Sequence, residues 1–519
     1  MTTERAGQPA ASPLHELLAE LEVFELSGNA AVAVKGLACD SRRVQPGDLF
    51  VALRGFRVDG HRFVDQAIER GAAAVVVEEY RESFPEVTRV VVPDTRKALA
   101  RLASAFFGHP GCSLHLIGVT GTNGKTTTTL LLESILREAG HRVGVLGTLA
   151  YRWGAEVRKA AMTTPESLEI QKYLAAMRDD GMTHVVMEVS SHALALSRVE
   201  GCPFRVGVFT NLSQDHLDFH ENMEAYFQAK TCLFTRCPAR APAPPVAVIN
   251  VDDPYGRRLA GMVPGPPVTF SIEDPGAEIH AENVTLSASG IHMTVRTPVG
   301  RLDLRSALLG RLNASNILAA VGAGVALGMP TDALVRGIEG VRGVDGRLQR
   351  LATAGGFDVV VDYAHTPDAM EKALACLREL TRGRLWAVFG CGGDRDRIKR
   401  PLMGRVAARL ADLVVLTSDN PRSEDPAAIL REIEPGVEAE GLSRFEPRDL
   451  PVSDRGYTVI ADRREAIEYV LSRALAGDLV FVGGKGHETY QIVGDMILDF
   501  DDRRVVAEFF RPARAAADD

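Results

Sequence analysis

The sequence predicts an α/β protein of three domains: a central domain with a phosphate-loop (P-loop) pattern on a mostly parallel sheet, a C-terminal doubly wound (Rossmann-like) domain and a smaller N-terminal unit. The chain has 519 residues, several times the length of one ordinary domain of about 100–200 residues. An apolar strand runs into a glycine loop and then a helix at residues 114–140. After residue 346, five candidate strands follow one another, separated by loops and helical patterns.

The first predicted domain covers residues 1–112. After a polar, proline-containing tail, the segments "GDLFVALRG" and "GAAAVVVEE" are short β-rich runs bounded by glycines and flanked by helical patterns. Hydrophobic residues make up 46% of the chain and charged residues 24%, as in a globular enzyme. The net charge of -9 provides no basic field for a nucleic-acid backbone, so we expect no nucleic-acid partner.

Cysteine usage and the N-terminus indicate a cytoplasmic protein. The seven cysteines are scattered, without a C-x-x-C pair, so we expect reduced thiols. The N-terminal stretch "MTTERAGQPAASPLHELL" contains acid and proline where a signal peptide needs a basic start and an apolar run. The longest apolar stretch, residues 317–329, is too short for a membrane span. We therefore expect no membrane partner.

The second predicted domain covers residues 113–345. The helix "TTTTLLLESILREAG" follows the glycine loop and is closed by Gly140. Further buried-type strands are expected in "HVVMEVSS", "VGVFTNLS" and "VAVINVDD", each ending in polar residues. Ligands of open parallel sheets bind at such carboxyl ends of strands. The proline-rich "CPARAPAPPV" between two of these strands is expected to be a surface loop.

The glycine loop "TGTNGKTTTT" departs from the common nucleotide pattern G-x-x-x-x-G-K-S/T, because Val119 stands five residues before Gly124. Gly121 and Gly124 let backbone N–H groups turn toward a phosphate. Lys125 is placed for the β and γ phosphates and Thr126 for magnesium. The alternative is a plain glycine turn before a threonine-rich helix start. Because strand, Gly-Lys-Thr and helix occur in register, a phosphate site is favoured.

Two polar residues after apolar strands are candidate cation ligands. Glu188 lies in "MEVSSH" and His216 in "NLSQDHLDFH", where a carboxylate and an imidazole could bind a cation directly or through water. A single histidine in such a place is more often structural. Lys230 interrupts the apolar face of the helix expected in "MEAYFQAKTCLF", and periodicity alone predicts a lysine that extends toward solvent.

The third predicted domain covers residues 346–519 and contains the glycine loops "GCGGDRDRIKRP" and "GGKGHE". Neither matches the dinucleotide pattern G-x-G-x-x-G, because Arg395 stands where its third glycine would be. The charged residues around these loops, Arg395, Arg422, His487 and Glu488, suit a zwitterionic small molecule. Arginine presents a planar fork to a carboxylate, and glutamate accepts from an ammonium group.

Ten motifs in order carry a resemblance to a known family. They are "GTNGKTT", "TTPE", "MEVSSHALALSR", "TNLSQDHLDFH", "AKTCLF", "NASN", "DYAHTPD", "GCGGDRDRIKRP", "DNPR" and "GKGHE". Together they resemble the Mur ligases of peptidoglycan synthesis, in the branch that adds meso-diaminopimelate. The family's loop reads T-G-T-N-G-K-T, which accounts for Val119.

The resemblance implies a function for each domain. The N-terminal domain would bind the UDP end of UDP-MurNAc-L-Ala-D-Glu, the central domain ATP and Mg²⁺, and the C-terminal domain meso-diaminopimelate. The implied enzyme is a monomeric cytoplasmic ligase that activates the D-glutamate γ-carboxylate as an acyl phosphate. These small molecules are the expected partners.

The resemblance also implies site residues, carried over one by one. Those for the nucleotide are Gly121, Thr122, Asn123, Gly124, Lys125, Thr126, Thr127, Asn313, Arg347 and His365. Those for magnesium are Thr126, Glu188, His216 and Lys230, the last as a carbamate; Lys125, Glu188, His216 and Lys230 are the implied catalytic residues. Those for the UDP-muramoyl peptide are Cys39, Ser41, Thr163, Thr164, Ser190, Ser191 and Arg198, together with the loop at residues 55–60. Those for diaminopimelate are Arg395, Asp419, Asn420, Pro421, Arg422, Gly484 and Glu488.

Two alternatives stay open at this point. A ligase similar to folylpolyglutamate synthetase also joins an amino acid to a glutamyl carboxylate with ATP, but "CDSRRVQPGDLFVALRG" resembles the UDP-binding domain of Mur ligases. A non-catalytic protein could instead use the glycine loop as a nucleotide switch. Phosphate release that depends on all three substrates separates enzyme from switch.

Overall fold

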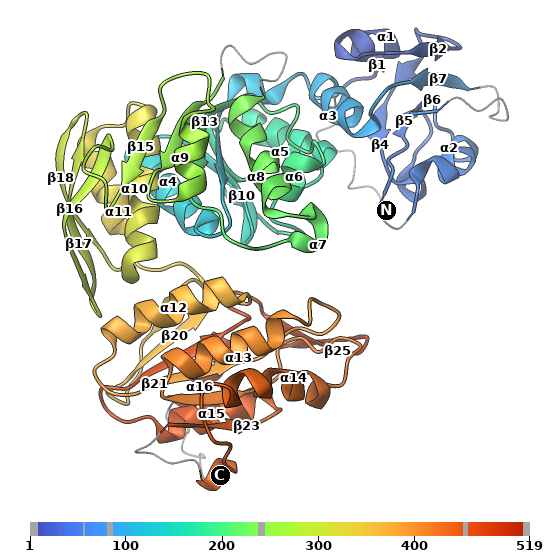
Figure 1. Ribbon diagram of the computed structural model, residues 1–519. Coiled ribbons are helices and arrows are strands. Elements are labelled where there is room, and N and C mark those ends of the chain that lie inside the picture. Colours follow the sequence, from blue (N-terminus) through green and yellow to red (C-terminus); the bar gives the residue numbers. More distant parts are fainter. Residues whose placement is uncertain (1–8, 56–57, 80–86, 237–243, 450–454, 512–519) are drawn as a thin grey trace, which may run out of the picture. The chain divides into compact units, whose positions relative to one another are not determined.

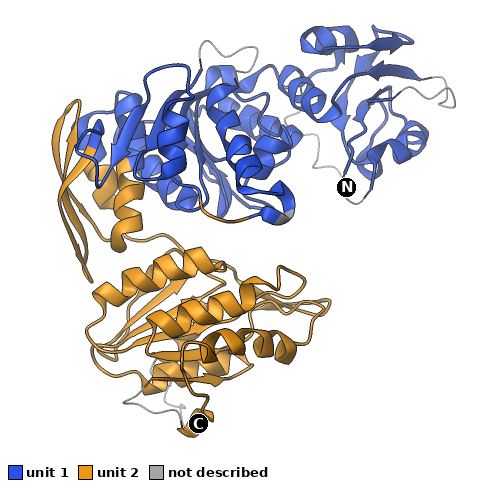
Figure 2. Ribbon diagram, viewed as in Figure 1, with its two compact units in different colours: residues 1–212, 216–279, 319–334 blue, residues 213–215, 280–318, 335–519 orange. Residues whose placement is uncertain are grey.

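The computed structural model describes residues 9–55, 58–79, 87–236, 244–449 and 455–511 (Figure 1). The chain divides into two compact units, which have different colours in Figure 2. Unit 1 consists of residues 1–212, 216–279 and 319–334, and unit 2 of residues 213–215, 280–318 and 335–519. The prediction of an α/β fold with parallel sheets is confirmed. The predicted boundaries after residues 112 and 345 remain predictions.

Unit 1 begins with a five-stranded sheet in the order β2-β7-β6-β5-β4. Its strands are β2 (Glu25–Ser27), β4 (Gly36–Ala38), β5 (Asp48–Val51), β6 (Ala74–Val77) and β7 (Thr88–Val91). All neighbours pair in parallel except β2 with β7. Helices α2 (Val64–Glu69) and α3 (Thr95–Phe106) follow strands, and Asp94 caps α3 by accepting from the N–H groups of Arg96 and Lys97. The β-rich runs of the sequence are therefore the strands of this sheet.

The second sheet of unit 1 carries the glycine loop. Its strands are β8 (His115–Thr120), β9 (Val143–Leu146), β10 (Ala150–Trp153), β11 (Glu156–Lys159), β12 (His184–Glu188), β13 (Phe204–Phe209), β14 (Val246–Asn250) and β15 (Val268–Ser271), in the order β11-β10-β9-β12-β8-β13-β14-β15. The strands from β9 to β15 in that order pair in parallel. Their continuous apolar runs are buried, as expected for strands covered on both faces.

Helices cover this sheet. They are α4 (Lys125–Glu138), α5 (Ser167–Asp179), α6 (Ser191–Ala195), α7 (Leu217–His220), α8 (Met223–Thr235) and α9 (Pro254–Ala260). The predicted helix after the glycine loop is α4, and the one in "MEAYFQAKTCLF" is α8. Gly140, with φ 83°, follows α4 and ends it as predicted.

Unit 2 contains an antiparallel three-stranded meander and a parallel sheet. The meander is β16 (Ile279–Ser287), β17 (Gly290–Thr297) and β18 (Gly300–Ser306), and it precedes helices α10 (Gly310–Ala326) and α11 (Thr331–Gly340). The strands of the other sheet are β19 (Gln349–Leu351), β20 (Asp358–Asp362), β21 (Leu385–Phe389), β22 (Leu413–Leu416), β23 (Gly456–Val459) and β24 (Leu479–Gly483). Their order is β19-β20-β24-β21-β22-β23, and only β19 pairs antiparallel.

Helices cover both faces of the last sheet, so the predicted doubly wound arrangement is confirmed. One apolar core lies under α12 (Pro367–Leu380), α13 (Lys399–Leu410) and α14 (Pro426–Glu438), and a second lies under α15 (Arg463–Arg473) and α16 (Asp502–Phe509). The structure differs from the regular strand and helix alternation at one place. After β24 the chain forms a hairpin, β25 (Tyr490–Val493) and β26 (Met496–Asp499), before α16. Gly484 and Gly486 have positive φ values there, which no right-handed helix accommodates.

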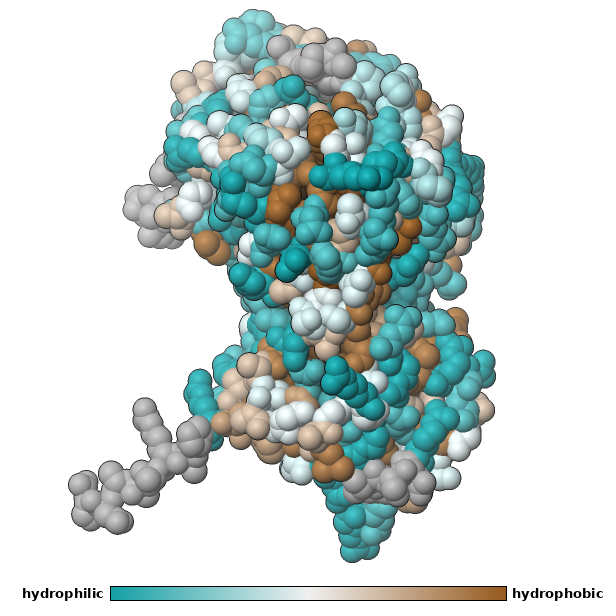
Figure 3. Space-filling view, turned by 90° about the vertical axis from the view of Figure 1, so that its left-hand side faces the viewer, coloured by the Kyte–Doolittle hydropathy of each residue, from teal (hydrophilic) through white to brown (hydrophobic). Residues whose placement is uncertain are grey.

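The surface in Figure 3 shows hydrophilic side chains surrounding narrow groups of apolar ones. Such a mixture is ordinary for a protein face in water. Among the described residues, no helix is both long and apolar enough to span a bilayer. The six cysteines in the described ranges are free thiols, and Cys237 lies outside those ranges.

Candidate active site

The glycine loop joins β8 to α4 and opens its backbone toward the helix N-terminus. Gly124, with φ 87°, is the residue before α4, and Gly121 has φ 149°. A Cβ on Gly121 would overlap the hydroxyl of Thr210, so only glycine fits this position. The Nζ of Lys125 donates to the carbonyl oxygens of Gly121 at 2.8 Å and Thr122 at 2.9 Å. The lysine therefore lies folded over the loop.

Glu188 ends β12 as a buried carboxylate, 2% exposed. One oxygen accepts from the hydroxyl of Thr126 at 2.9 Å and from that of Thr148 at 2.9 Å, and the other accepts from the N–H of Thr148 at 2.9 Å. Within the described ranges all its hydrogen-bond donors are neutral. A buried anion with a neighbouring hydroxyl and no cationic partner among these donors suits a divalent metal ion. The predicted pair Thr126 and Glu188 thus fits magnesium.

Lys230 lies on α8 and is 1% exposed. Its Nζ donates to the carbonyl oxygen of Gly121 at 3.0 Å and lies 4.6 Å from the ring centroid of Tyr226. The periodicity-based prediction of a lysine reaching solvent is therefore wrong, because the loop after β8 packs onto this face of the helix. The side chain instead points at the phosphate loop.

His216 stands at the N-terminus of α7, in the left-handed region with φ 55°. Its ring contacts His192 edge-on with centroids 4.8 Å apart, and its centroid lies 6.2 Å from that of Tyr226. The hydroxyl of Tyr226 lies 3.1 Å from that of Thr122 in the glycine loop. His216 therefore belongs to an aromatic cluster that borders the loop. No group of three or more His, Cys, Asp or Glu side chains in the described chain is arranged to hold a metal, so water and phosphate oxygens would have to complete magnesium coordination.

The residues predicted for the muramoyl peptide come together beside Glu188. The hydroxyl of Thr164 donates to the carbonyl oxygen of Glu188 at 2.8 Å and accepts from the N–H of Ser190 at 3.0 Å. The hydroxyl of Thr163 lies 3.1 Å from that of Thr148. Arg198 donates to the carbonyl oxygen of Thr164 at 3.1 Å and pairs with Glu166 at 2.6 Å. The predicted substrate group thus lies on the same strand end as the metal candidate.

Cys39, predicted for the UDP end, lines a cavity of about 400 Å³ in unit 1. Its other lining residues include the basic Arg43, Arg158 and Lys172 and the aromatic Phe106, Phe107 and Tyr173. Ser41 is buried, and its hydroxyl donates to the side-chain oxygen of Gln66 at 2.6 Å. Residues 56 and 57 of the predicted loop at 55–60 lie outside the described ranges.

Three residues predicted for the nucleotide belong to unit 2. Asn313 is buried, and its side chain donates to the carbonyl oxygen of Leu309 at 2.9 Å. The Arg347 guanidinium lies over the ring of Tyr363 at 4.7 Å. His365 contacts the same ring, with centroids 4.7 Å apart. Burial, followed by the nearby Lys399, lowers the pKa of His365 below its usual value, so its imidazole is neutral at pH 7.

Asp419 and Asn420 follow β22 and are buried. The Nζ of Lys485, which is fully buried, donates to the side-chain oxygen of Asn420 at 3.0 Å and to Glu488 at 3.2 Å, and lies 4.0 Å from Asp419. The side-chain amide of Asn420 donates to Glu488 at 2.9 Å. The sequence predicts that the two carboxylates meet the ammonium groups of an amino acid. The structure adds a resident cation between them.

Arg422 has φ 52°, and β25 holds its backbone. Its N–H donates to the carbonyl oxygen of Ile492 at 3.0 Å, and its carbonyl accepts from the N–H of Gly494 at 2.8 Å. Its guanidinium donates to the carbonyl oxygen of Gly393 at 2.7 Å. Arg395 is exposed on the neighbouring loop. The two arginines predicted to bind carboxylate therefore lie on two loops that contact each other.

Pro421 and Gly484 complete the predicted diaminopimelate residues. Pro421 is buried between Asn420 and Arg422. Gly484 has φ 110°, and a Cβ there would overlap the carboxylate of Asp419. Glycine at this position lets the loop after β24 approach Asp419 closely.

Comparison with known proteins finds one family along most of the chain. Residues 33–107 match the model "Mur ligase family, catalytic domain", residues 119–324 the "Mur ligase middle domain" and residues 346–486 the "Mur ligase, glutamate ligase domain". The UDP-N-acetylmuramoyl-L-alanyl-D-glutamate--2,6-diaminopimelate ligase of Geobacter metallireducens is 48% identical over 502 residues, which cover 96% of this chain and 98% of that protein. The chain belongs to the Mur ligase family.

Solved Mur ligases share the fold of this chain. A structure of UDP-N-acetylmuramoyl-L-alanyl-D-glutamate--2,6-diaminopimelate ligase is 33% identical, with a TM-score of 0.68, and the match covers 96% of this chain and 99% of that one. A MurF ligase from Thermotoga maritima in complex with ADP is 19% identical, with a TM-score of 0.60 and coverage of 91% and 96%. The second likeness concerns the fold alone.

Sequence reasoning missed several residues of this Mur ligase site. Asn211 binds the backbone of the glycine loop. Its side chain accepts from the N–H of Asn123 at 3.0 Å and donates to the carbonyl oxygen of Asn123 at 3.1 Å. Thr210 donates to the same carbonyl at 2.6 Å. His220 bonds the hydroxyl of Ser191 at 2.8 Å. Thr210, Asn211 and His220 lie in "TNLSQDHLDFH", so the available signal was their position after β13.

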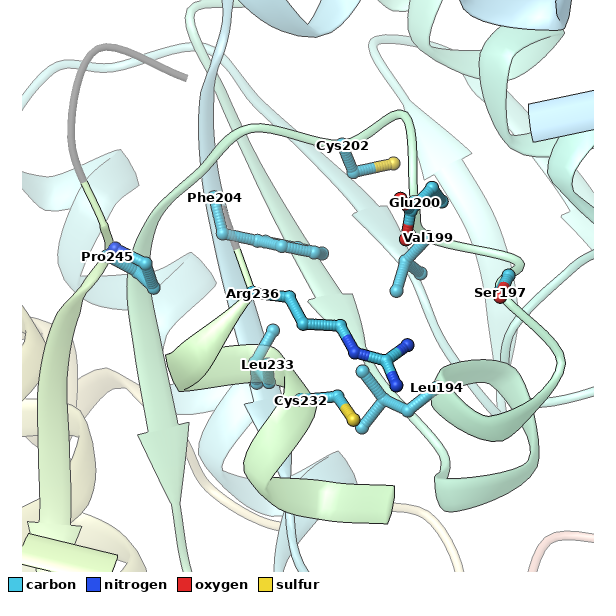
Figure 4. Close-up of a pocket in the computed structure, with 10 residues that line it drawn as sticks. All are labelled: Leu194, Ser197, Val199, Glu200, Cys202, Phe204, Cys232, Leu233, Arg236 and Pro245. Atoms are coloured by element: carbon cyan, nitrogen blue, oxygen red, sulfur yellow. The ribbon is translucent and has the colours of Figure 1, made fainter. Parts of the chain in front are cut away.

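A second, small cavity of this Mur ligase lies in unit 1 (Figure 4). Its lining residues are Leu194, Ser197, Val199, Glu200, Cys202, Phe204, Cys232, Leu233, Arg236 and Pro245. Its volume of about 40 Å³ admits a few water molecules and no nucleotide or sugar. The cavity bordered by Cys39 is the larger of the two by an order of magnitude.

Proposed function

We propose that the protein joins meso-diaminopimelate to UDP-MurNAc-L-Ala-D-Glu with hydrolysis of ATP to ADP and phosphate. The observation that carries this proposal is the position of Glu188. Its carboxylate bonds Thr126 of the nucleotide loop, while its carbonyl bonds Thr164 of the substrate group. One residue would therefore contact both the triphosphate site and the site for the second substrate, and such proximity supports direct phosphoryl transfer between the two substrates.

The first step makes the D-glutamate carboxylate electrophilic. A γ-carboxylate oxygen attacks the γ-phosphorus of ATP, the bond to the β–γ bridging oxygen breaks, and ADP leaves. Carboxylate and triphosphate repel each other, so cationic groups must lie where the charges meet. Lys125 supplies one cation, and the N–H groups at the start of α4 supply further donors.

Thr126 and Glu188 would hold magnesium, and bound Mg²⁺ neutralises charge on the phosphate oxygens. His216 borders the same loop and is a further proposed ligand. Lys230 as an ammonium would repel a metal ion. As a carbamate its buried head becomes anionic, which suits a site rich in cations; we include this modification in the proposal.

The second step forms the amide bond. An unprotonated amine of diaminopimelate attacks the acyl carbon, phosphate leaves, and the nitrogen loses a proton. The amino-acid site would use Arg422 and Arg395 for carboxylate, with Asp419 and Glu488 facing ammonium. Lys485 already balances part of that negative charge, because its ammonium lies 3.2 Å from Glu488 and 4.0 Å from Asp419.

The alternatives receive less support. A nucleotide switch would need no second substrate, and so would not account for the substrate group of Thr164, Ser190 and Arg198 next to Glu188. A folylpolyglutamate-type substrate carries no UDP, whereas the N-terminal residues 33–107 match a Mur ligase model and include Cys39 at the 400 Å³ cavity. We propose small-molecule partners only, action in the cytoplasm and a monomeric state.

One assay tests the function. The purified protein is incubated with ATP, Mg²⁺, UDP-MurNAc-L-Ala-D-Glu and either meso-diaminopimelate or lysine, and both phosphate and the UDP-MurNAc-tripeptide are measured. We expect phosphate release to require all three substrates and the tripeptide to contain diaminopimelate. Phosphate release without the amino acid, at an unchanged rate, would support the switch instead.

A further inference from the structure

Two loops that carry the candidate carboxylate-binding arginines are joined directly. They are residues 392–396 with Arg395 and residues 420–424 with Arg422, here called the arginine loops. The N–H of Gly393 donates to the carbonyl oxygen of Asn420 at 2.9 Å. The carboxylate of Asp394 accepts from the N–H of Ser423 at 3.2 Å and from its hydroxyl at 2.7 Å. The loops therefore form one hydrogen-bonded unit.

An ion pair with a buried arginine lies behind this unit. Arg400, on α13, is fully buried, and its two terminal nitrogens donate to the two oxygens of Glu424 at 2.8 and 2.9 Å. Arg400 also donates to the carbonyl oxygen of Gly392 at 3.3 Å. Glu424 accepts from the N–H of Asp394 at 2.6 Å. One ion pair thus contacts both arginine loops from the side of the helix.

The chemistry of this pair favours a fixed geometry. Two parallel charge-assisted hydrogen bonds between a guanidinium and a carboxylate define both distance and angle. Hydrogen bonds from Arg400 are the main cause that lowers the pKa of Glu424 to about 2, so the pair is ionised at neutral pH. Loss of Glu424 would remove one of the carboxylates that compensate the charge of the fully buried Arg400. The pair therefore resists displacement.

A second carboxylate bonds the same arginine from outside the arginine loops. Glu432, on α14, accepts from Arg400 at 2.8 Å and also pairs with Arg397. Glu424 and Glu432 thus share a chemical type and a partner, Arg400. They differ in location, since only Glu424 belongs to an arginine loop. This difference provides a matched control.

The loops also hold backbone conformations that need support. Asp394 and Arg422 both have φ 52°, a left-handed value that costs free energy for residues with a Cβ. A Cβ on Gly393 would overlap the carbonyl oxygen of Pro421, so the two backbones are in close contact. Such conformations persist only where neighbouring groups determine them. Arg400 and Glu424 are among the neighbouring groups that hold these backbone conformations, through their hydrogen bonds to Gly392 and Asp394.

We propose that Arg400 and Glu424 are positioning residues that fix the separation and direction of Arg395 and Arg422, and thereby the preference for an amino acid with a distal carboxylate. This inference rests on the proposed function, because it concerns recognition of diaminopimelate. Neither Arg400 nor Glu424 needs to touch the substrate. Their effect is on the geometry of the two guanidinium groups that do.

The test compares Glu424→Gln with Glu432→Gln in the full-length protein. An amide in place of the Glu424 carboxylate presents N–H to one of its donors, so at least one bond from Arg400 or Asp394 is lost and the arginine loops shift relative to each other. We expect Glu424→Gln to raise KM for diaminopimelate about tenfold or more and to shrink the preference over lysine similarly, as expected when a charged hydrogen-bond partner is lost. The values of kcat and of KM for ATP and the UDP substrate should change less than about threefold. Glu432→Gln should keep KM for diaminopimelate within about twofold.

If Glu424→Gln fails to fold, a second variant tests the same link between the arginine loops. Ser423→Ala removes an exposed hydroxyl that bonds Asp394, and it should shift KM for diaminopimelate in the same direction by a smaller factor. Thermal unfolding of each variant separates positioning from general stability. The inference is overturned if Glu424→Gln keeps the wild-type KM and preference, or if both glutamine variants raise KM equally. A wild-type protein that does not use diaminopimelate would instead overturn the proposed function.

Discussion

The ammonium of Lys230 donates a hydrogen bond to the carbonyl oxygen of Gly121 at 3.0 Å, across 109 residues of the chain. Gly121 belongs to the nucleotide loop, and Lys230 belongs to helix α8. At 1% exposure the lysine head is removed from water. Its position next to a phosphate loop makes the chemical form of this side chain decisive for the charge of the site.

Lys230→Ala is expected to be nearly inactive, because the variant lacks the anionic head that the proposed carbamate supplies near magnesium. Short carboxylic acids should restore part of the activity by occupying the vacated space. Activity with and without acetate, together with intact mass of the native protein, measures this. Lys97→Ala, at an exposed lysine paired with Asp94, is the control and should stay active. A fully active native protein with an unmodified Lys230 amine would contradict the proposal.

Lys125→Ala is expected to lower kcat by about two to three orders of magnitude, since a lost phosphate clamp removes several kcal/mol of transition-state stabilisation. The fold should persist, because Lys125 lies at the surface of the loop and its ammonium donates to carbonyl oxygens of that same loop, at Gly121 and Thr122. Steady-state kinetics and circular dichroism measure the two effects. Near-normal ligation by a folded variant would remove the basis for an ATP site in this loop.

Arg422→Ala is expected to raise KM for diaminopimelate and to reduce its preference over lysine. We expect the native preference to be at least about a hundredfold in kcat/KM, because a desolvated guanidinium without a carboxylate partner costs a few kcal/mol. KM for ATP and for the UDP substrate should change little. Competition between the two amino acids, followed by product mass, measures the preference. If Arg422→Ala keeps the full preference, another residue reads the distal carboxylate.

A cluster of three imidazoles predicts acid sensitivity of unit 1. His184 lies between His115 and His141, with ring centroids 4.7 and 4.2 Å apart, and Arg205 donates to His115 at 2.8 Å. Burial is the main cause that lowers the pKa of His184 from 6.5 to about 4, followed by the neighbouring His141, His115 and Arg205. The unfolded chain therefore binds a proton below pH 6.5, while the folded chain does not until about pH 4.

The sign follows from this difference in proton binding. The contribution of His184 to the free energy of unfolding is complete above pH 6.5, and it decreases as the pH falls toward 4. We expect the free energy of unfolding to fall by about 1–2 kcal/mol from this group between pH 7 and pH 5, with allowance for solvent screening. Urea titrations at both pH values, for the wild type and His184→Gln, measure it. His292→Gln, at a histidine exposed to solvent, is the control. Equal pH dependence of wild type and His184→Gln would contradict this assignment.

Much of the fold follows from local patterns. The apolar runs with polar ends predict β8, β12, β13 and β14, and the glycine loop with its threonines predicts the start of α4. Strand and helix patterns depend on short segments, so they can be recognised without the rest of the chain. The hairpin of β25 and β26 was not foreseen. Its path depends on positive φ values at Gly484 and Gly486 that fit against Asp419 and Tyr363.

The sequence predicts which residue types form the amino-acid site, but it does not predict which of these residues contact one another. Charges near the glycine loops predict Arg422 and Glu488, and the resemblance to Mur ligases adds Asp419. Lys485 was not predicted, although it lies within hydrogen-bond distance of Asn420 and Glu488. Residue 420 follows β22 and residue 485 follows β24, so only the assembled sheet brings them together.

By itself, the sequence determined the order of the elements, the chemical groups available to the site and the family to which the motifs belong. Tertiary structure decided which of these groups are buried and which partners they have. Lys230 shows the physical reason, because helical periodicity places it on the apolar face, where a lysine is expected to extend toward solvent, while the loop at Gly121 removes its head from water. Burial and hydrogen bonding depend on atoms that are distant in the chain, and local patterns carry no record of those atoms.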